Sequence, residues 1–151
     1  MNWLQAVIHG SNCLDLFAGT GALGFEALSR GANSVVMVEQ NRSQCDELRK
    51  QAKILGADGA KIVYADGLKW LDSSSQGFDI IFLDPPFAEN VIAKACEKLT
   101  NKRHLHRESR LYIESSLDQE IKMKDFKVLK QSRAGQVQYQ LIKPEEGLVK
   151  E

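Results

Sequence analysis

The sequence alternates short apolar runs with segments of helical periodicity, and this alternation constrains the fold more than any other feature. Residues 35–38 are four consecutive apolar side chains, which is typical of a strand that a parallel sheet buries on both faces. Residues 42–55 repeat apolar side chains at intervals of three and four, so they form one stripe of a helix that Gly56 would end. Elements in this order predict an open, doubly wound α/β sheet.

The expected elements account for most of the chain. The expected strands are residues 12–17, 34–39, 60–65, 78–83, 110–114, 126–131 and 137–142. The expected helices are residues 22–30, 42–55, 68–71 and 91–99. The last two strands alternate apolar and polar side chains around a turn at Gly135, which is typical of a β-hairpin at a sheet edge. We therefore expect a mostly parallel seven-stranded sheet with an antiparallel C-terminal hairpin, followed by a frayed, charged tail at 144–151.

Composition places the chain among ordinary globular proteins. Its 151 residues suffice for one domain spanning 1–151, and 43% of them are apolar. No apolar run approaches the roughly 18 residues that cross a bilayer, and the first ten residues do not resemble a signal peptide. We therefore expect a cytoplasmic protein without a membrane partner. Cys13, Cys45 and Cys96 form no CxxC pattern, so we expect buried thiols and no metal.

Charge is balanced over the whole chain but not along it. Twenty basic residues match twenty acidic ones, so there is no overall electrostatic signature of nucleic-acid binding. Residues 101–151 alone hold 11 basic and 8 acidic side chains, and a basic cluster lies at 102–107. We expect this cluster on or near the ligand edge of the sheet, where it could contact RNA phosphates, although a solvated loop is the commoner structure.

Four acidic residues lie at or just beyond the ends of successive expected strands. Asp15, Glu39, Asp66 and Asp84 are separated by 24, 27 and 18 residues, which is the repeat length of a strand and its helix. The carboxyl ends of parallel strands face one edge of a sheet, where ligands bind. Acids in such positions also cap helices, and either interpretation suits any one of them. All four together predict one cleft for a ligand rich in hydroxyl and amino groups.

A glycine-rich loop follows the first expected strand. Residues 19–24 match the pattern GxGxxG, in which glycines allow positive φ and a close backbone approach to a ligand. Glu39, twenty residues after Gly19, is placed to bind the hydroxyls of a ribose, which fits either NAD or S-adenosylmethionine. Asp15 favours S-adenosylmethionine, because a carboxylate there repels a pyrophosphate and attracts a cationic amino group; Asp66 would receive the adenine amino group. The candidate cofactor-binding residues are Asp15, Phe17, Ala18, Gly19, Gly21, Glu39, Gln40, Asp66 and Gly67.

The candidate catalytic residues are Asp84, Pro85, Pro86 and Phe87, directly after an apolar strand. A planar exocyclic amine is a poor nucleophile because its lone pair is delocalised into the ring. If Asp84 and a backbone carbonyl of the proline pair accept its two N–H groups, the nitrogen can pyramidalise and direct its lone pair at an electrophilic methyl group. The prolines stiffen the loop, Phe87 offers a face for base stacking, and Asp84 or a nearby water can take the released proton. A simple turn after a buried strand is the alternative.

Together these segments resemble the class I S-adenosylmethionine-dependent methyltransferases that act on amino groups. More closely, the chain resembles the bacterial 16S ribosomal RNA guanine-N2 methyltransferases of the RsmD type. The general resemblance rests on Asp15 to Gly24, Val38-Glu39 and Asp84 to Phe87. The closer one rests on Asn2-Trp3-Leu4, Glu26 to Ala32 and Ala134 to Val137. The resemblance implies a Rossmann-like fold and a cytoplasmic enzyme that methylates a guanine of small-subunit ribosomal RNA. Members of that family usually carry a basic segment before the Asn-Trp-Leu stretch, and we expect this chain to lack it.

Several alternatives stay open. The same chemistry could act on adenine N6 of a nucleic acid or on a protein amide, although an aspartate at position 84 favours guanine over these. An NAD-dependent oxidoreductase fits the glycine-rich loop but leaves residues 84–87 unexplained. A catalytically silent cofactor-binding domain would bind the cofactor without turnover. The expected partner is ribosomal RNA or the small ribosomal subunit, and a monomer is the expected oligomeric state.

Overall fold

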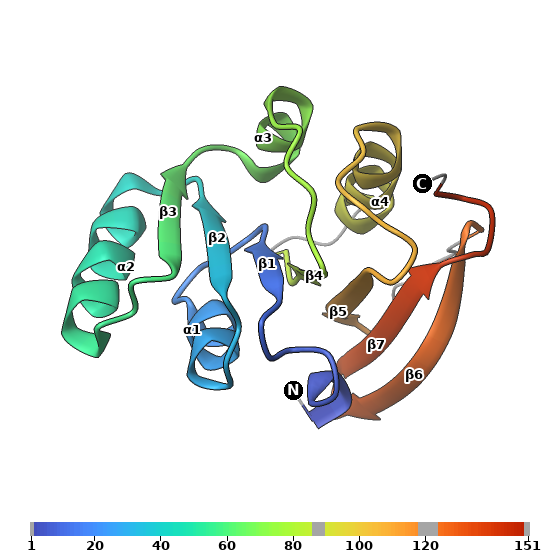
Figure 1. Ribbon diagram of the computed structural model, residues 1–151, viewed down its shortest axis with the longest axis horizontal. Coiled ribbons are helices and arrows are strands. Elements are labelled where there is room, and N and C mark those ends of the chain that lie inside the picture. Colours follow the sequence, from blue (N-terminus) through green and yellow to red (C-terminus); the bar gives the residue numbers. More distant parts are fainter. Residues whose placement is uncertain (1, 86–89, 118–123, 150–151) are drawn as a thin grey trace.

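The computed structural model describes residues 2–85, 90–117 and 124–149, and it contains one seven-stranded sheet with helices on both faces (Figure 1). The strands are β1 (Asn12–Asp15), β2 (Ser34–Glu39), β3 (Ala60–Tyr64), β4 (Ile80–Leu83), β5 (Arg110–Ser116), β6 (Phe126–Ala134) and β7 (Val137–Pro144). The helices are the 3-10 helix η1 (Asn2–Leu4) and the α-helices α1 (Ala22–Ser29), α2 (Arg42–Leu55), α3 (Gly67–Ser73) and α4 (Val91–Asn101). None of the helices in these described ranges is both long and apolar enough to cross a membrane.

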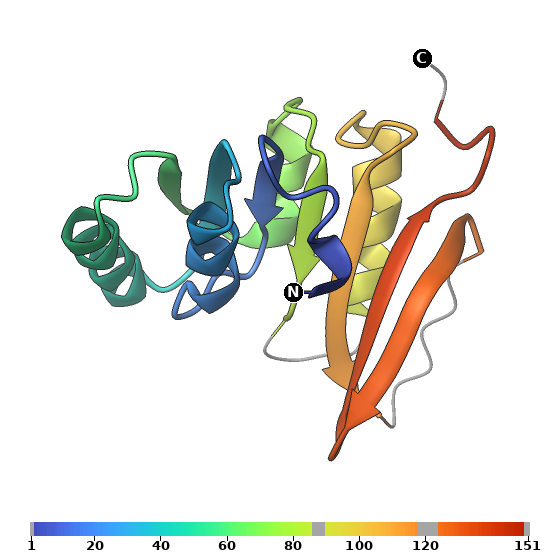
Figure 2. The same ribbon diagram turned by 60° about the horizontal axis from the view of Figure 1, so that its bottom comes forward.

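The strand order is β3-β2-β1-β4-β5-β7-β6, and the first five strands of this order are parallel. The hairpin of β6 and β7 adds to β5 in the antiparallel direction and extends the sheet at one edge, as Figure 2 shows. The expected fold class is confirmed. The chain reverses its winding direction on either side of β1, so the carboxyl ends of β1 and β4 flank the switch point where ligands bind in such sheets.

Two apolar clusters hold the layers together, one on each face of the sheet. Val35, Met37 and Phe82 point to the face that η1, α1 and α2 cover. Alternate residues of the same strands, such as Val36 and Ile81, point to the face that α3 and α4 cover. Because both faces of β2 and β4 are buried, these strands are continuous apolar runs instead of alternating ones.

The observed bounds differ from the expected ones mainly at the strand ends. β1 ends at Asp15 instead of residue 17, because the chain turns there into the glycine-rich loop. The hairpin is longer than expected, since pairing between β6 and β7 continues from Val137 to Pro144. The expected fraying of 144–149 is wrong: Leu148 and Val149 pack against the core, and the Glu145 N–H donates to the Asp125 carbonyl.

The expected position of the basic cluster at 102–107 is also wrong. This segment connects α4 to β5 and so lies at the amino ends of the parallel strands, opposite the edge where β1 and β4 end. His104 is fully buried there, and its backbone carbonyl accepts a hydrogen bond from Phe78, just before β4. His106 Nε2 lies 2.7 Å from the Asp79 carboxylate. The cluster therefore packs at the amino edge of the sheet, away from the edge where ligands are expected.

Gly21 is the position in the first loop where a side chain is least tolerable. It caps the start of α1 with φ of 84°, and a Cβ built there would lie 2.6 Å from the Phe25 ring and 2.7 Å from Leu48. Gly56 has a similar φ of 63° at the end of α2, but a Cβ there would meet nothing within 4 Å. An alanine at Gly56 would therefore add backbone strain alone, whereas an alanine at Gly21 would add both backbone strain and steric overlap.

We expect Gly56→Ala to lower the free energy of unfolding by about 1 kcal/mol, the cost of a left-handed alanine. Gly21→Ala should cost roughly 2–3 kcal/mol, because overlap with Phe25 and Leu48 adds to the same strain. Chemical denaturation of both variants measures the difference. Equal losses would contradict the close packing of Gly21.

Candidate active site

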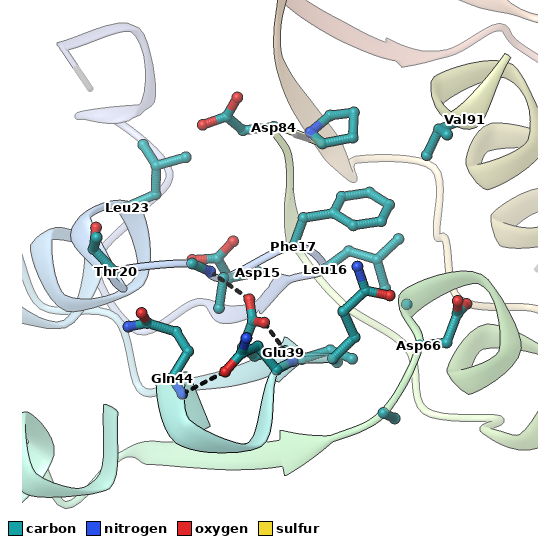
Figure 3. Close-up of a pocket in the computed structure, with 18 of the residues that line it drawn as sticks. Asp15, Leu16, Phe17, Thr20, Leu23, Glu39, Gln44, Asp66, Asp84 and Val91 are labelled. Carbon is teal, nitrogen blue, oxygen red and sulfur yellow. Dashed lines mark hydrogen bonds between the residues drawn. The ribbon is translucent and has the colours of Figure 1, made fainter. Parts of the chain in front are cut away.

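A pocket of about 660 Å³ opens at the carboxyl edge of the sheet, above the ends of β1, β2 and β4 (Figure 3). All four strand-end acids line it: Asp15 from β1, Glu39 from β2, Asp66 before α3 and Asp84 after β4. In the view of Figure 3, Asp15 lies between Asp84 and Glu39. The parallel register places them together, since Asp15 pairs with Met37 on one side and Phe82 on the other. Glu39 ends β2 and Asp84 follows β4, so both reach the same edge of the sheet as Asp15.

Asp15 is the most unusual of the four acids because it is almost fully buried. Its side chain is 1% exposed, and its Oδ2 atom has no hydrogen-bond partner among the described residues. Burial, as the largest cause, and the charges of Asp84, Glu39 and Glu114 together raise its pKa to about 7, although the backbone N–H of Gly24 acts in the opposite direction. A carboxylate held in this way lacks a cation or donor that would satisfy it.

The glycine-rich loop is held against the ends of β2 and β4 by backbone hydrogen bonds. The Ala18 N–H donates to the Val38 carbonyl at 2.9 Å, and the Leu16 N–H donates to the Phe82 carbonyl at 3.3 Å. Gly19 has φ of 55° and faces open space, so the backbone itself forms that part of the pocket wall. This arrangement lets a ligand approach the main chain without meeting a Cβ.

Glu39 joins the loop to the start of α2. Its Oε1 accepts from the Gly19 N–H at 3.0 Å, and its Oε2 accepts from the Asn41 N–H at 2.7 Å. Each carboxylate oxygen has a further lone pair, so both can accept from ligand hydroxyls while they hold the backbone. The Asn41 side chain in turn caps α2 by accepting from the Gln44 N–H.

Asp66 and Gly67 form the wall near α3. Asp66 Oδ1 accepts from the Lys69 N–H at 3.1 Å, so the helix-cap interpretation holds for this acid, although it also lines the pocket. Gly67 is buried, and a Cβ there would lie 2.8 Å from the Leu16 carbonyl oxygen and 3.0 Å from the Phe17 ring. Gly67 thus lets α3 approach the first loop closely.

Asp84 and Pro85 lie at the mouth of the pocket, directly after β4. Asp84 is exposed, yet its partial burial raises its pKa above the ordinary value for aspartate. It therefore holds a proton more readily than a fully solvated carboxylate. Pro86 and Phe87, the other two candidate catalytic residues, lie outside the described residues.

The structure brings most of the candidate residues together. The pocket is lined by Phe17, Ala18, Gly19, Gln40 and Gly67 as well as the four acids and Pro85. Gly21 does not line it; this glycine supports the loop from behind, at the start of α1. Sequence reasoning missed lining residues such as Leu23, Gln44 and Val91, which come from the first turns of three helices. These residues could have been predicted from the sequence, because helices that follow parallel strands begin at the ligand edge of the sheet.

A family model described as Conserved hypothetical protein 95 matches residues 1–143. The chain belongs to this family. The chain is 36% identical over 145 residues to the Ribosomal RNA small subunit methyltransferase D of Haemophilus influenzae, covering 93% of this chain and 75% of that relative. The protein of the same name from Escherichia coli K12 is 34% identical over 146 residues, covering 95% and 74%. A solved structure of an Escherichia coli protein described as a methyltransferase has a TM-score of 0.90 at 34% identity, covering 95% of this chain and 82% of that one.

The names of these relatives confirm the expected resemblance, and the likeness to the solved structure confirms the expected methyltransferase fold. Within the described ranges, no group of three or more His, Cys, Asp or Glu side chains is arranged to hold a metal ion. The three cysteines are buried, as expected.

The buried charge of Asp15 gives a pH-dependent prediction for the ligand-free protein. Its folded pKa of about 7 lies above the ordinary 3.8, so the folded state binds more protons between these values, and stability falls as the pH rises from about 4 to 7. At about 1.4 kcal/mol per pKa unit, charging Asp15 at pH 8 costs on the order of 4 kcal/mol. We expect Asp15→Asn to gain stability relative to the native chain, more at pH 8 than at pH 4, in thermal and denaturant unfolding.

Asp66→Asn is the matched control, because Asp66 is exposed in the same pocket and asparagine caps a helix equally well. Its stability relative to the native chain should not grow between pH 4 and pH 8. A flat difference for Asp15→Asn as well would show that the Asp15 carboxylate is solvated.

Proposed function

We propose that this protein transfers a methyl group from S-adenosylmethionine to the exocyclic N2 amino group of a guanine in 16S ribosomal RNA. The observation that carries the proposal is that Asp84 and Pro85 line the same pocket as the buried Asp15 and the ribose-binding candidate Glu39. A donor site and an acceptor for an amine therefore share one cleft. The names of the curated relatives, ribosomal RNA small subunit methyltransferases, support the substrate class.

The residues present fit the cofactor. The unpartnered Oδ2 of Asp15 suits the cationic amino group of a methionine moiety, since a buried carboxylate gains most from a paired cation. The two oxygens of Glu39 suit the two hydroxyls of a ribose, and Asp66 offers an acceptor to the adenine amino group. Leu16, Phe17 and Leu68 supply apolar surface for the ring between them. We therefore propose that the candidate cofactor-binding residues hold S-adenosylmethionine.

The bound cofactor supplies a methyl group on a positively charged sulfur, which makes the methyl carbon electrophilic. Asp84 accepts one N–H of the target amine, and the rigid Pro85 segment holds the second acceptor, so the nitrogen presents its lone pair to the pocket. The raised pKa of Asp84, caused by partial burial, suits it to take up the proton that the nitrogen releases. Catalysis is then mainly positioning, and the base must leave its stack to reach Asp84.

Of the other interpretations, an oxidoreductase fits less well, whereas adenine methylation and a silent domain share the proposed donor site. An NAD-dependent oxidoreductase would place a pyrophosphate beside Asp15, whose buried carboxylate repels it. Methylation of adenine N6 uses the same donor site and differs only in which base edge faces Asp84. A silent domain would share the donor site too, so it predicts cofactor binding without turnover on ribosomal RNA.

Calorimetry with S-adenosylmethionine, S-adenosylhomocysteine and NAD tests the donor. We expect the first two to bind and NAD to give no heat. Binding should strengthen as the pH rises from 6 to 8, because the cationic ligand binds ionised Asp15, whose pKa is about 7. Asp15→Asn should lose this pH dependence and bind at least about 10-fold more weakly. Binding of NAD alone would overturn the proposal.

Asp84→Ala tests the acceptor. We expect it to lower methyl transfer to 16S ribosomal RNA by a factor on the order of 100 to 1,000, as the loss of a preorganised polar contact does, while calorimetry shows unchanged cofactor affinity. Asp84→Asn keeps the shape and one acceptor oxygen and should retain part of the activity. Mass spectrometry of the modified nucleoside identifies the methylated atom. Unchanged turnover in Asp84→Ala would rule out its role.

A further inference from the structure

Glu114 on β5 lies next to Asp84 at the same edge of the sheet. β4 and β5 are parallel, with Phe82 opposite Tyr112 and Leu83 opposite Ile113. The next residues along these two strands are Asp84 and Glu114, so the register brings them side by side. Two steps along a strand return to the same face, and therefore both follow the aromatic pair of Phe82 and Tyr112 on the face covered by η1.

The position of the Glu114 carboxylate is held by its neighbours. The Tyr112 hydroxyl donates a hydrogen bond to Glu114 Oε1 at 3.2 Å. Tyr112 is itself fixed by edge contacts with Trp3 and Phe82, at centroid distances of 6.3 and 6.1 Å. Tyr139 of β7 lies opposite Glu114 in the register of β5 and β7. Within the described part of the chain no hydrogen bond reaches Glu114 Oε2, so this oxygen can accept from a ligand.

Glu114 and Asp84 are electrostatically coupled. Partial burial raises the pKa of Glu114, and the charge of Asp84 raises it further, whereas the Tyr112 hydrogen bond and the positive charge of the N-terminus favour the ionised form. Two carboxylates side by side, of which Glu114 is half-buried and Asp84 more exposed, repel each other unless donors come between them. A ligand with two adjacent N–H groups relieves this repulsion.

Guanine carries such a pair of donors, because its N1–H lies beside its N2 amino group. Building on the proposed function, we propose that Glu114 accepts the N1–H of the target guanine while Asp84 accepts an N–H of the amino group to be methylated. Glu114 lies outside the lining of the donor pocket, on the side of Asp84 away from β1. This is where the acceptor base belongs, since the donor occupies the ends of β1 and β2.

The same contact selects against adenine. N1 of adenine is an acceptor, so an adenine that presents its N6 amino group to Asp84 would set a lone pair against the Glu114 carboxylate. A polar site that leaves its groups unpaired rejects the wrong ligand strongly. Glu114 is therefore the residue that would decide between the guanine and adenine alternatives.

The test uses 16S ribosomal RNA in which the methylated guanine is located by mass spectrometry and then replaced by 2-aminopurine. This base keeps the 2-amino group, but its N1 is an acceptor without hydrogen. We expect the native protein to prefer guanine over 2-aminopurine by at least about 10-fold in kcat/KM. Glu114→Gln should reduce that preference by about 10-fold or more, because the amide N–H can donate to N1 of 2-aminopurine.

Glu108→Gln, just before the opposite end of β5, is the matched control and should leave the preference unchanged. Calorimetry with S-adenosylmethionine should give native affinity for Glu114→Gln, which shows that the variant is folded. If Glu114→Gln lowers turnover on both bases by the same factor, Glu114 has only a structural role. That result would overturn this inference and leave the proposed function intact. No methylation of guanine by the native protein would instead overturn the proposed function, and this inference with it.

Discussion

Parallel hydrogen bonding of β1 between β2 and β4 is the constraint on which the rest of the structure depends. It sets Asp15 in register with Met37 and Phe82 and so brings three strand ends to one edge. The glycine-rich loop, the starts of the helices and the pocket above them all follow from this alignment. The short β1 can occupy the centre because its apolar residues are buried on both faces, Leu14 on one and Cys13 on the other.

The arrangement concentrates negative charge where burial makes charge expensive. Asp15 illustrates the conflict most clearly, because the packing that positions its carboxylate also leaves Oδ2 without a partner in the described structure. Such a group lowers the stability of the ligand-free protein, and a ligand that brings a cation or a hydrogen-bond donor would satisfy it. Stability and ligand affinity are therefore opposed at this residue, as is common at functional sites.

The other acids combine a structural task with an exposed acceptor. Glu39 holds the glycine-rich loop and the start of α2 through its two oxygens, and Asp66 caps α3. Helix capping and ligand binding are thus not exclusive interpretations, because a carboxylate oxygen has more than one lone pair. Glu114 extends the acidic edge to β5, where Tyr112 holds it beside Asp84.

The sequence by itself determined the layer architecture, most element positions and the common edge of the four acids, because hydrophobic periodicity and turn residues are local signals. The basic cluster at 102–107 could also have been placed from the sequence, because a segment that leads from a helix into a parallel strand lies at the amino edge of the sheet. The sequence could not single out Glu114, which sits in an ordinary strand and becomes a neighbour of Asp84 only through the register of β4 and β5. Tertiary structure alone decided how deeply Asp15 is buried, since burial depends on packing between elements far apart in the chain.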